Sequence, residues 1–408
     1  MPLIRPFTGL RPAPAHAADV VAPPYDVLSS AEARARAAGK PWSFLHISKP
    51  EIDLPPDTDP YSPDVYAKGL ENLSTMVAQG ILQRDARPYY YLYQLIMGTH
   101  TKTGLVAAAS VAAYEQGRIC KHEFTRPDKE DDRVRQIDAL NAQTGPVMLT
   151  YRHTPAIDTI VAATVRTPPE FDITADDGIY HRLWVVRDEN QIALLSKAFE
   201  AVDYLYIADG HHRCAAAARV AASRGGADDA SHQYFLAVIF SDNQMQILDY
   251  NRVIRDLNGL SAEQFLKRLG ESFTVELSGK PVKPAQAGEF GMYLSGQWYR
   301  LSIRAELIPQ HDPVARLDVS LLADYCIAPV LGINDPRRDK RIDFVGGIRG
   351  LAELEKRVDS GDMAVAFALF PTSMSDLMAV SDSGEVMPPK STWFEPKLGD
   401  GLVSQVLD

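Results

Sequence analysis

The sequence predicts a mixed α/β fold in two domains, and three observations support this prediction. Segments rich in branched and aromatic residues, such as residues 89–97 and 204–208, are typical of buried strands. They alternate with segments of helical periodicity, such as residues 63–80. The chain of 408 residues is longer than a single hydrophobic core usually serves. We therefore expect an α/β domain over residues 1–260 and a second α/β domain over residues 261–408.

The N-terminal part begins with an extended segment, because the prolines among residues 1–30 exclude a continuous helix. Ser29 and Ser30 are typical helix caps and predict a helix that ends at Gly39. The helix over residues 63–80 places four large residues on one face: Tyr66, Leu70, Leu73 and Val77. The following elements are expected in this order: strands over residues 89–97 and 105–111, an extended segment over 118–123, a charged helix from Pro127 that ends before Gly145, and a strand over 147–151.

The middle of the chain alternates between strand and helix, which points to a mixed sheet. Its expected elements are a strand over 180–187, a helix over 191–201, a strand over 204–208, a helix over 214–222, and strands over 235–240 and 245–250. The second domain repeats the alternation with a helix over 320–330, a strand over 341–345, a helix over 351–358 and a strand over 364–370.

Composition excludes several classes of protein. The formal charge is -11 and no Lys/Arg-rich run is present, which argues against a nucleic-acid partner. No apolar run approaches the roughly 20 residues that span a bilayer, and residues 1–7 lack a signal-peptide pattern, so we expect a cytoplasmic protein without a membrane partner. Cys120, Cys214 and Cys326 lie far apart, so neither a disulfide framework nor a cysteine zinc site is expected.

The segment Asp209-Gly210-His211-His212-Arg213 follows a predicted buried strand and opens a helix. The first N–H groups of a helix lack internal partners and carry partial positive charge, so they can bind a phosphate. Gly210 lets the backbone approach the phosphate closely, and Arg213 adds a planar fork of donors. His211 and His212 add further donors, while Asp209 can orient one of them or hold Mg²⁺. The alternative is a capped helix with half-exposed histidines.

The two histidines of this turn are not expected to share one transition-metal ion. Adjacent side chains on a helix point about 100° apart, which is a poor arrangement for ligands of a single ion. A phosphate role for His211 and His212 is therefore favoured over a zinc site built from this pair.

A second cluster covers residues 121–126, at the end of an expected strand and the start of a loop. Glu123 is the candidate general base. Lys121, His122 and Arg126 flank it and could tune its pKa or contact an anionic substrate. The alternative is a solvated edge strand with mixed charges.

Three weaker signals complete the candidate sites. Lys390, Ser391 and Thr392 lie on a proline-stiffened loop and are candidate cofactor contacts, with a docked tail as the alternative. Residues 23–26, Pro-Pro-Tyr-Asp, predict a rigid turn that could line a pocket. The pair at residues 346–347, Gly-Gly, could receive a phosphate but lacks the spacing of a Walker loop or a dinucleotide fingerprint.

Four segments together resemble a bacterial and archaeal family known as domain of unknown function family 1015, over nearly the whole chain. They are residues 22–27, 121–132, 208–213 and 387–397. The Asp-Gly-x-His-Arg turn also resembles the signature of the ParB/sulfiredoxin-like superfamily, whose members bind nucleotide phosphates at this helix start. The resemblance implies a mixed-sheet ParB/sulfiredoxin-like core with a second α/β unit at the C-terminus. Sulfiredoxin chemistry is disfavoured, because that family has a cysteine where His211 stands here.

Within this superfamily the free-serine kinases are the closest chemical parallel, since they have a comparable turn and use a glutamate as base. The resemblance implies that Asp209 lies near the metal, while His211, His212 and Arg213 hold phosphate. Glu123, Asp209 and His212 are then the catalytic candidates. Gly210, His211, Arg213, Arg126, Lys390, Ser391 and Thr392 are the cofactor-binding candidates.

The resulting functional prediction is a small-molecule kinase that phosphorylates free L-serine with Mg²⁺ and ATP or ADP. Two alternatives stay open. One is a non-catalytic regulator that binds a nucleotide in the same pocket. The other is a nucleotide-switched DNA-associated protein, against which the acidic composition argues.

Overall fold

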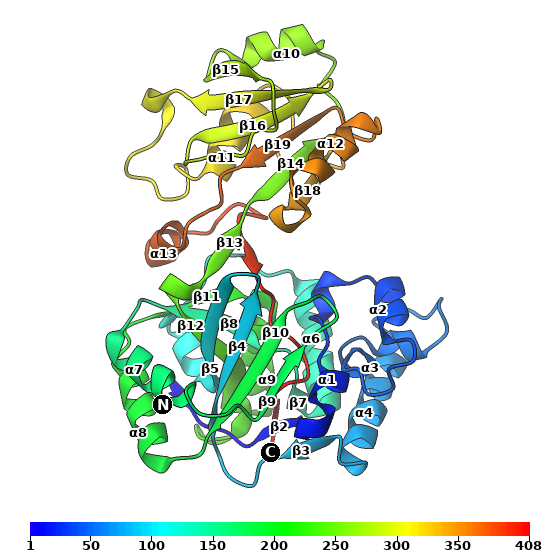
Figure 1. The fold of residues 1–408 in the computed structure, drawn as a ribbon, viewed down its shortest axis with the longest axis vertical. Coiled ribbons are helices and arrows are strands. Elements are labelled where there is room, and N and C mark those ends of the chain that lie inside the picture. The colour runs from blue at the N-terminus through cyan, green and yellow to red at the C-terminus, as the bar shows by residue number, and fades with distance from the viewer. The chain divides into compact units, whose positions relative to one another are not determined.

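The computed structural model describes residues 1–408 in two compact units (Figure 1). Unit 1 contains Met1–Met245 and Pro396–Asp408, and unit 2 contains Gln246–Glu395. This division differs from the expected one in two respects. The boundary lies after Met245 rather than near residue 260, and the chain returns to unit 1 at its end. There β21 (Ser404–Val406) pairs with β2 (Gly9–Pro12) and β7 (Ala142–Gln143).

Unit 1 is built on a nine-stranded mixed sheet, which confirms the predicted mixed α/β class. The strand order is β6 (Ile119–Cys120), β11 (Leu205–Asp209), β8 (Val147–Tyr151), β12 (Tyr234–Ser241), β5 (His100–Ser110), β4 (Tyr90–Met97), β10 (Tyr180–Val186) and β9 (Phe171–Thr174), with β1 (Ile4–Arg5) paired to β5. The pairs β6/β11 and β8/β12 are parallel, and the other neighbours are antiparallel. These strands are rich in branched and aromatic residues, which fit a pleated sheet that is buried.

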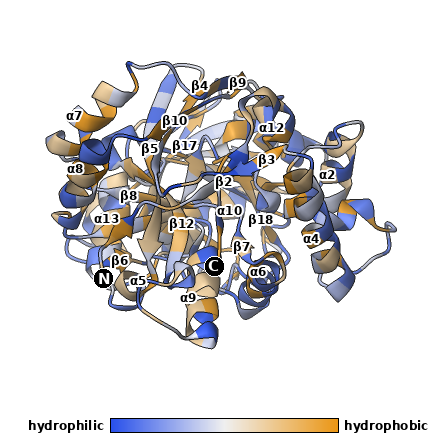
Figure 2. Cartoon of the chain, turned by 90° about the horizontal axis from the view of Figure 1, so that it is seen from below, coloured by the Kyte–Doolittle hydropathy of each residue, from blue (hydrophilic) through white to orange (hydrophobic).

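Four helices pack their apolar residues with these strands into one core: α5 (Val111–Glu115), α7 (Pro155–Thr164), α8 (Glu189–Glu200) and α9 (His211–Arg224). In Figure 2 the same helices also bear hydrophilic residues, as expected of helices with one face in a core. A second core joins β2, β3 (Leu82–Arg84) and β7 to the remaining helices of unit 1. These are α1 (Ala17–Val20), α2 (Ser30–Ala37), α3 (Leu45–Ser48), α4 (Pro63–Ala78) and α6 (Pro127–Leu140).

Unit 2 is an α/β unit with a six-stranded antiparallel sheet. Its strand order is β15 (Phe273–Ser278), β17 (Gln297–Ile303), β16 (Glu289–Leu294), β19 (Val365–Leu369), β14 (Tyr250–Ile254) and β18 (Ile342–Gly346). A short ribbon pairs β13 (Gln246–Leu248) with β20 (Trp393–Glu395). The helices are α10 (Ala262–Leu269), α11 (Asp318–Leu322), α12 (Leu351–Asp359) and α13 (Met374–Asp382).

Two predicted elements in this part of the chain are observed in a different form. The helix expected over residues 320–330 is the short α11, followed by a π-helical turn over Ala323–Ile327. The single strand expected over residues 245–250 is divided between β13 and β14, because the chain changes from one ribbon to another sheet there.

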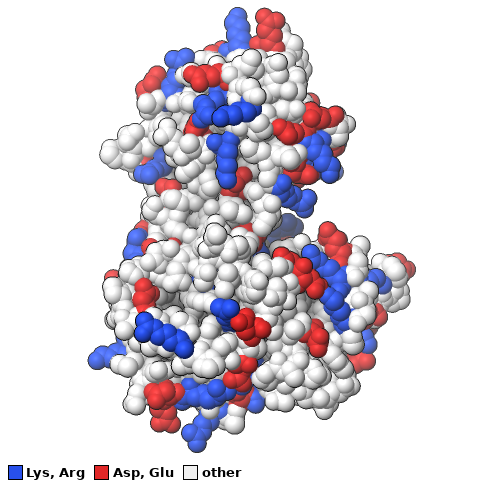
Figure 3. Space-filling view, viewed as in Figure 1, with Lys and Arg blue, Asp and Glu red and all other residues white.

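The following features concern the helices, the cysteines and the surface charge. None of the helices is both long enough and apolar enough to span a bilayer. All three cysteines are buried and free of disulfides, and burial raises the pKa of the Cys214 thiol. On the face shown in Figure 3, basic and acidic residues are interspersed.

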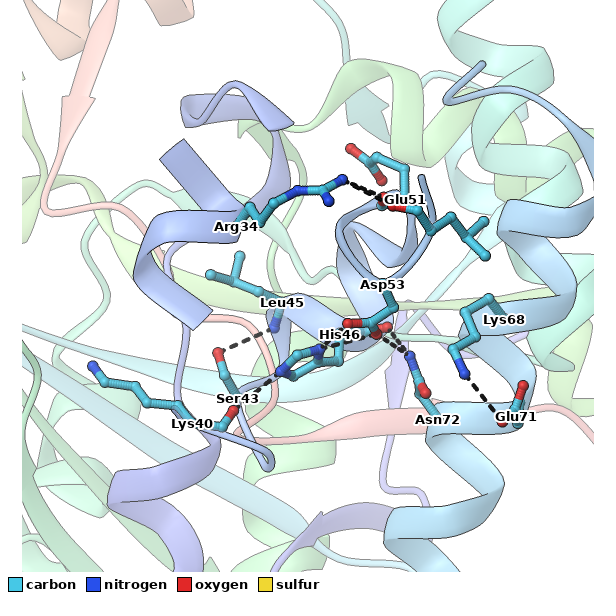
Figure 4. A network of polar contacts seen from close by, with 11 residues as sticks. Arg34, Lys40, Ser43, Leu45, His46, Glu51, Asp53, Lys68, Glu71 and Asn72 are labelled. Atoms are coloured by element: carbon cyan, nitrogen blue, oxygen red, sulfur yellow. Dashed lines mark hydrogen bonds and ion pairs between the residues drawn. The ribbon is translucent and has the colours of Figure 1, made fainter. Parts of the chain in front are cut away.

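Polar contacts join α3, η3 (Pro50–Asp53) and α4 (Figure 4). His46 donates from Nδ1 to the Asp53 carboxylate at 2.8 Å, and its Nε2 lies 3.1 Å from the carbonyl oxygen of Lys40. Asn72 donates to the same carboxylate at 2.8 Å. The hydrogen bond to Asp53 raises the pKa of His46, because it favours the charged imidazolium.

Replacing Asp53 with Asn is expected to lower the free energy of unfolding by at most about 1 kcal/mol near pH 6, because the pair is partly exposed to solvent. A raised pKa of His46 stabilises the fold at pH values below its ordinary 6.5, and this contribution is lost as the pH rises. The difference in the free energy of unfolding between wild type and D53N should therefore be smaller at pH 8.5 than at pH 6, as measured by urea denaturation. An equal difference at both pH values would contradict the charge effect.

Candidate functional site

Two of the predicted clusters meet at one edge of the unit 1 sheet. Strands β6 and β11 are parallel neighbours, with Leu205 opposite Ile119 and Tyr206 opposite Cys120. Their carboxyl ends therefore lie at the same edge, which is where ligands bind in many open α/β sheets. Residues 121–126 follow β6, and Asp209 ends β11, so that residues 210–213 follow it.

The turn at Gly210 joins β11 directly to α9. Gly210 has φ 102° and ψ 30°, a left-handed conformation that glycine adopts without steric cost. Helix α9 begins at His211, earlier than the expected residue 214, and no side chain caps it. Its first N–H groups thus have the arrangement that an anion such as phosphate can bind.

The two histidines of the turn hold the loop that follows β6. Nε2 of His211 accepts a hydrogen bond from the backbone N–H of His122 at 3.4 Å. Nε2 of His212 accepts one from the backbone N–H of Arg126 at 3.1 Å. A nitrogen that accepts carries no proton, so each ring is a Nδ1–H tautomer in this arrangement. The predicted donor role of His211 and His212 toward phosphate would have to use their Nδ1 atoms.

Glu123 lies beside the turn. Its Oε2 is 3.9 Å from Nδ1 of His211, and half of its side chain is exposed. The His211 ring also meets the His122 ring edge to face, with centroids 4.5 Å apart. The parallel pairing of β6 and β11 therefore brings the candidate base Glu123 next to the turn, although the two are far apart in the sequence.

His122 and His211 are both neutral at pH 7. Burial lowers the pKa of His122 to about 4, and the side chain is 2% exposed. Burial also lowers the pKa of His211 well below its ordinary value, and the neighbouring His122 lowers it further. Neutral imidazoles can accept hydrogen bonds and can bind metal ions.

Lowering the pH from 7 to 5 is expected to lower the free energy of unfolding through His122 by about 2 kcal/mol, because the unfolded chain takes up the proton and the buried ring does not. The depressed pKa stabilises the fold above pH 6.5, and this contribution is lost as the pH falls toward 4. The variant H122Q, whose amide does not titrate, should lose correspondingly less stability over this range in urea denaturation. An identical pH dependence of variant and wild type would contradict this assignment.

Asp209 is ionised and has a lysine beside it. Burial raises the pKa of Asp209, but Lys397 and Arg213 more than offset this, so the pKa lies below the ordinary value. Nζ of Lys397 donates to Oδ2 of Asp209 at 3.2 Å. Lys397 was not among the predicted site residues, although it ends the last of the four segments in the family resemblance.

The guanidinium of Arg213 is also engaged by protein groups. It donates to Oδ2 of Asp26 at 3.2 Å and to the carbonyl oxygen of Pro146. Beside it lies a cavity of about 30 Å³, larger than the roughly 10–15 Å³ that one water needs. Tyr25 and Asp400 are among the residues that line this cavity. Residues 23–26 thus contribute a side chain to a pocket.

Asp400 is a candidate site residue that the sequence did not indicate, because it lines the cavity beside Arg213. Burial raises its pKa to about 7, Arg213 opposes this shift, and Asp26 adds to it. Its side chain is 1% exposed. No local pattern distinguishes this aspartate, because its neighbours in the cavity come from distant parts of the chain.

Of the remaining predicted residues, Arg126 meets the turn through its backbone N–H, and the others lie in unit 2. The Arg126 side chain is exposed and pairs with Asp128 at 2.8 Å. Lys390, Ser391 and Thr392 belong to unit 2, where the Ser391 hydroxyl donates to the carbonyl oxygen of Pro388. Their contact with a nucleotide stays a prediction.

Comparison with known proteins identifies the family. The model of a family described as "Protein of unknown function (DUF1015)" matches residues 4–320. The chain belongs to this family. A search among curated proteins found no match.

Three solved structures illustrate what the DUF1015 chain is similar to. A free serine kinase in complex with AMP has 13% identity and a TM-score of 0.37, covering 73% of this chain and 92% of that chain. A conserved hypothetical protein from Pyrococcus furiosus has 14% identity and a TM-score of 0.36, covering 72% and 93%. SbnI with a C-terminal truncation from Staphylococcus aureus has 12% identity and a TM-score of 0.38, covering 72% and 84%. Likenesses of this size carry no functional argument.

Proposed function

We propose that this protein is a small-molecule kinase that binds a nucleotide at the turn of residues 209–213. One observation carries the proposal: a carboxylate, Glu123, stands beside an uncapped helix start whose N-cap is a left-handed glycine. The helix start suits the phosphates of a nucleotide, and the carboxylate suits a general base. Phosphoryl transfer requires chiefly this combination of positioning and charge neutralisation.

The residues take the following roles in the proposal. The first N–H groups of α9 donate to phosphate oxygens, and Gly210 permits their close approach. Mg²⁺ would accompany the nucleotide, and the ionised Asp209 is an oxygen ligand of the kind this ion prefers. Lys397 shares that carboxylate and adds positive charge near the phosphates.

Glu123 activates the acceptor in the proposed reaction. It takes the proton from the substrate hydroxyl while the hydroxyl oxygen bonds to the terminal phosphorus. The bond between that phosphorus and the bridging oxygen breaks, and the shortened nucleotide leaves with the electron pair. The free-serine acceptor and the ATP or ADP donor come from the resemblance of the turn to that of free-serine kinases.

The direct test is an assay of the purified full-length protein with Mg²⁺, ATP or ADP, and a panel of amino acids that includes L-serine. We expect a phosphate ester that is detected by ³¹P nuclear magnetic resonance and that requires the amino acid. Absence of a phosphorylated product with every pairing would contradict the kinase.

The second candidate is a regulator that binds nucleotide without turnover. It is favoured by the engagement of Arg213 with Asp26 and Pro146, since these contacts occupy donors that would otherwise reach a transferring phosphoryl group. Saturable nucleotide binding in calorimetry together with no product from the assay would identify this function.

A further inference from the structure

We propose that His122, Glu123 and His211 bind a divalent transition-metal ion of the zinc class. The three residues come from the ends of the parallel neighbours β6 and β11, so the sheet itself brings them together. This site goes beyond the proposed kinase and does not depend on it.

The geometry lies close to that of a coordinated ion. One ligand atom from each residue can be chosen so that all three lie within 4.8 Å of one another. The Oε2 atom of Glu123 is 3.9 Å from Nδ1 of His211. Ligands at about 2.1 Å from a tetrahedral zinc ion are about 3.4 Å apart, so a small shift suffices. The Glu123 side chain is half exposed, so its position is fixed less by packing than those of the two buried histidines.

One of the two buried members of the group, His122, has an unsatisfied atom. Nδ1 of His122 is buried and has no hydrogen-bond partner, and the residue is 2% exposed. Native proteins pair nearly all buried polar atoms, so an exception calls for a missing partner. A metal ion bound by this histidine would supply that kind of partner.

The donor set selects the class of ion. Two imidazoles and one carboxylate are the protein ligands of many catalytic zinc sites and of non-haem iron sites. Mg²⁺ prefers oxygen ligands in an octahedral arrangement. The group of His122, Glu123 and His211 is therefore a separate site from the Mg²⁺ site proposed at Asp209. Three protein ligands also leave a coordination position for water.

Metal binding has a structural consequence for the loop of residues 121–126. Coordination through Nδ1 of His211 moves the ring proton to Nε2, which then cannot accept from the His122 N–H. The 3.4 Å contact between these atoms is the one that must open. A carboxylate bound to the ion also cannot serve as a general base, so metal binding and phosphoryl transfer should exclude each other.

The test is calorimetric titration of the chelator-treated full-length protein with ZnCl₂, without nucleotide. We expect a single site in the wild type. We expect E123Q to bind at least about ten-fold more weakly, because even the loss of an outer partner of a metal site has that effect. H211A should show the same loss. Since no nucleotide is present, this result is separate from the outcome of the kinase assay.

The matched control is H181A. His181 lies in β10, is 3% exposed, and has a pKa that burial lowers to about 4, as for His122. It should keep the wild-type affinity for zinc. E123Q alters a half-exposed side chain and is expected to fold, which circular dichroism would verify. No saturable binding in the wild type, or unchanged affinity in both E123Q and H211A, would overturn the proposal.

Discussion

Replacing Glu123 with Gln is expected to lower the rate of phosphoryl transfer by about 100- to 10,000-fold, the usual contribution of a general base. The amide keeps the size of the side chain but cannot take up the substrate proton. Nucleotide affinity should stay within about two-fold of the wild type, because the phosphates are held by the helix start rather than by this carboxylate. Steady-state kinetics and calorimetry with the nucleotide measure the two quantities separately.

The matched control is E115Q, which removes a carboxylate from the exposed end of α5. It should keep wild-type kinetics. Full activity in E123Q would show that Glu123 is not the base, without contradicting the proposal that the protein is a kinase. Loss of nucleotide affinity in E123Q would place the carboxylate in the binding step.

Replacing Gly210 with Ala is expected to weaken nucleotide binding by about ten-fold or more, the effect of losing one hydrogen bond to a charged group. A Cβ on this residue would lie 3.4 Å from Val147 Cα and the Arg213 guanidinium, in the space beside the helix start. The left-handed φ of 102° also strains any other residue by about 1–2 kcal/mol. Nucleotide titration measures the affinity, and urea denaturation measures the strain.

Gly117 provides the control for the strain. It has φ 79°, and a Cβ there would meet nothing within 4 Å. G117A should therefore lose comparable stability but keep the wild-type affinity for nucleotide. Equal affinity in G210A and G117A would show that the turn is structural and binds no phosphate.

Local sequence patterns predict the strands of unit 1 well. The expected strand over residues 147–151 coincides with β8, and the one over 89–97 differs from β4 (Tyr90–Met97) by one residue. Both are dense in branched or aromatic residues whose preference for a pleated, buried surface is a local property. The helix from Pro127 is likewise observed as α6, because proline is well suited to a first helical position.

The buried face of α4 was predicted only in part. Of the four residues expected on one face of α4, Tyr66 and Leu73 are buried, whereas Leu70 and Val77 are more than 40% exposed. The buried face is completed by smaller or neighbouring positions such as Gly69 and Met76. Helical periodicity allows several adjacent stripes, and the contacts with α3 and α6 decide among them.

In the candidate site, too, some features follow from neighbouring residues and others only from the tertiary structure. The turn of residues 209–213 could be predicted because strand, glycine and helix start are consecutive in the chain, and its binding of phosphate stays a proposal. Lys397 and Asp400 could not be connected with it, since they return to unit 1 only after the whole of unit 2. Their contacts with Asp209 and the cavity beside Arg213 depend on the return of the C-terminal segment.

The sequence by itself determined the mixed α/β class, most strands and the strand–glycine–helix turn at Gly210, because each depends on neighbouring residues. The role of Glu123 as a base stays a prediction. The tertiary structure decided that Glu123 reaches the turn, since only the parallel pairing of β6 with β11 joins segments so distant in the chain. It also decided the state of the histidines. Burial against each other and against the sheet keeps His122 and His211 neutral, and no local pattern encodes that burial.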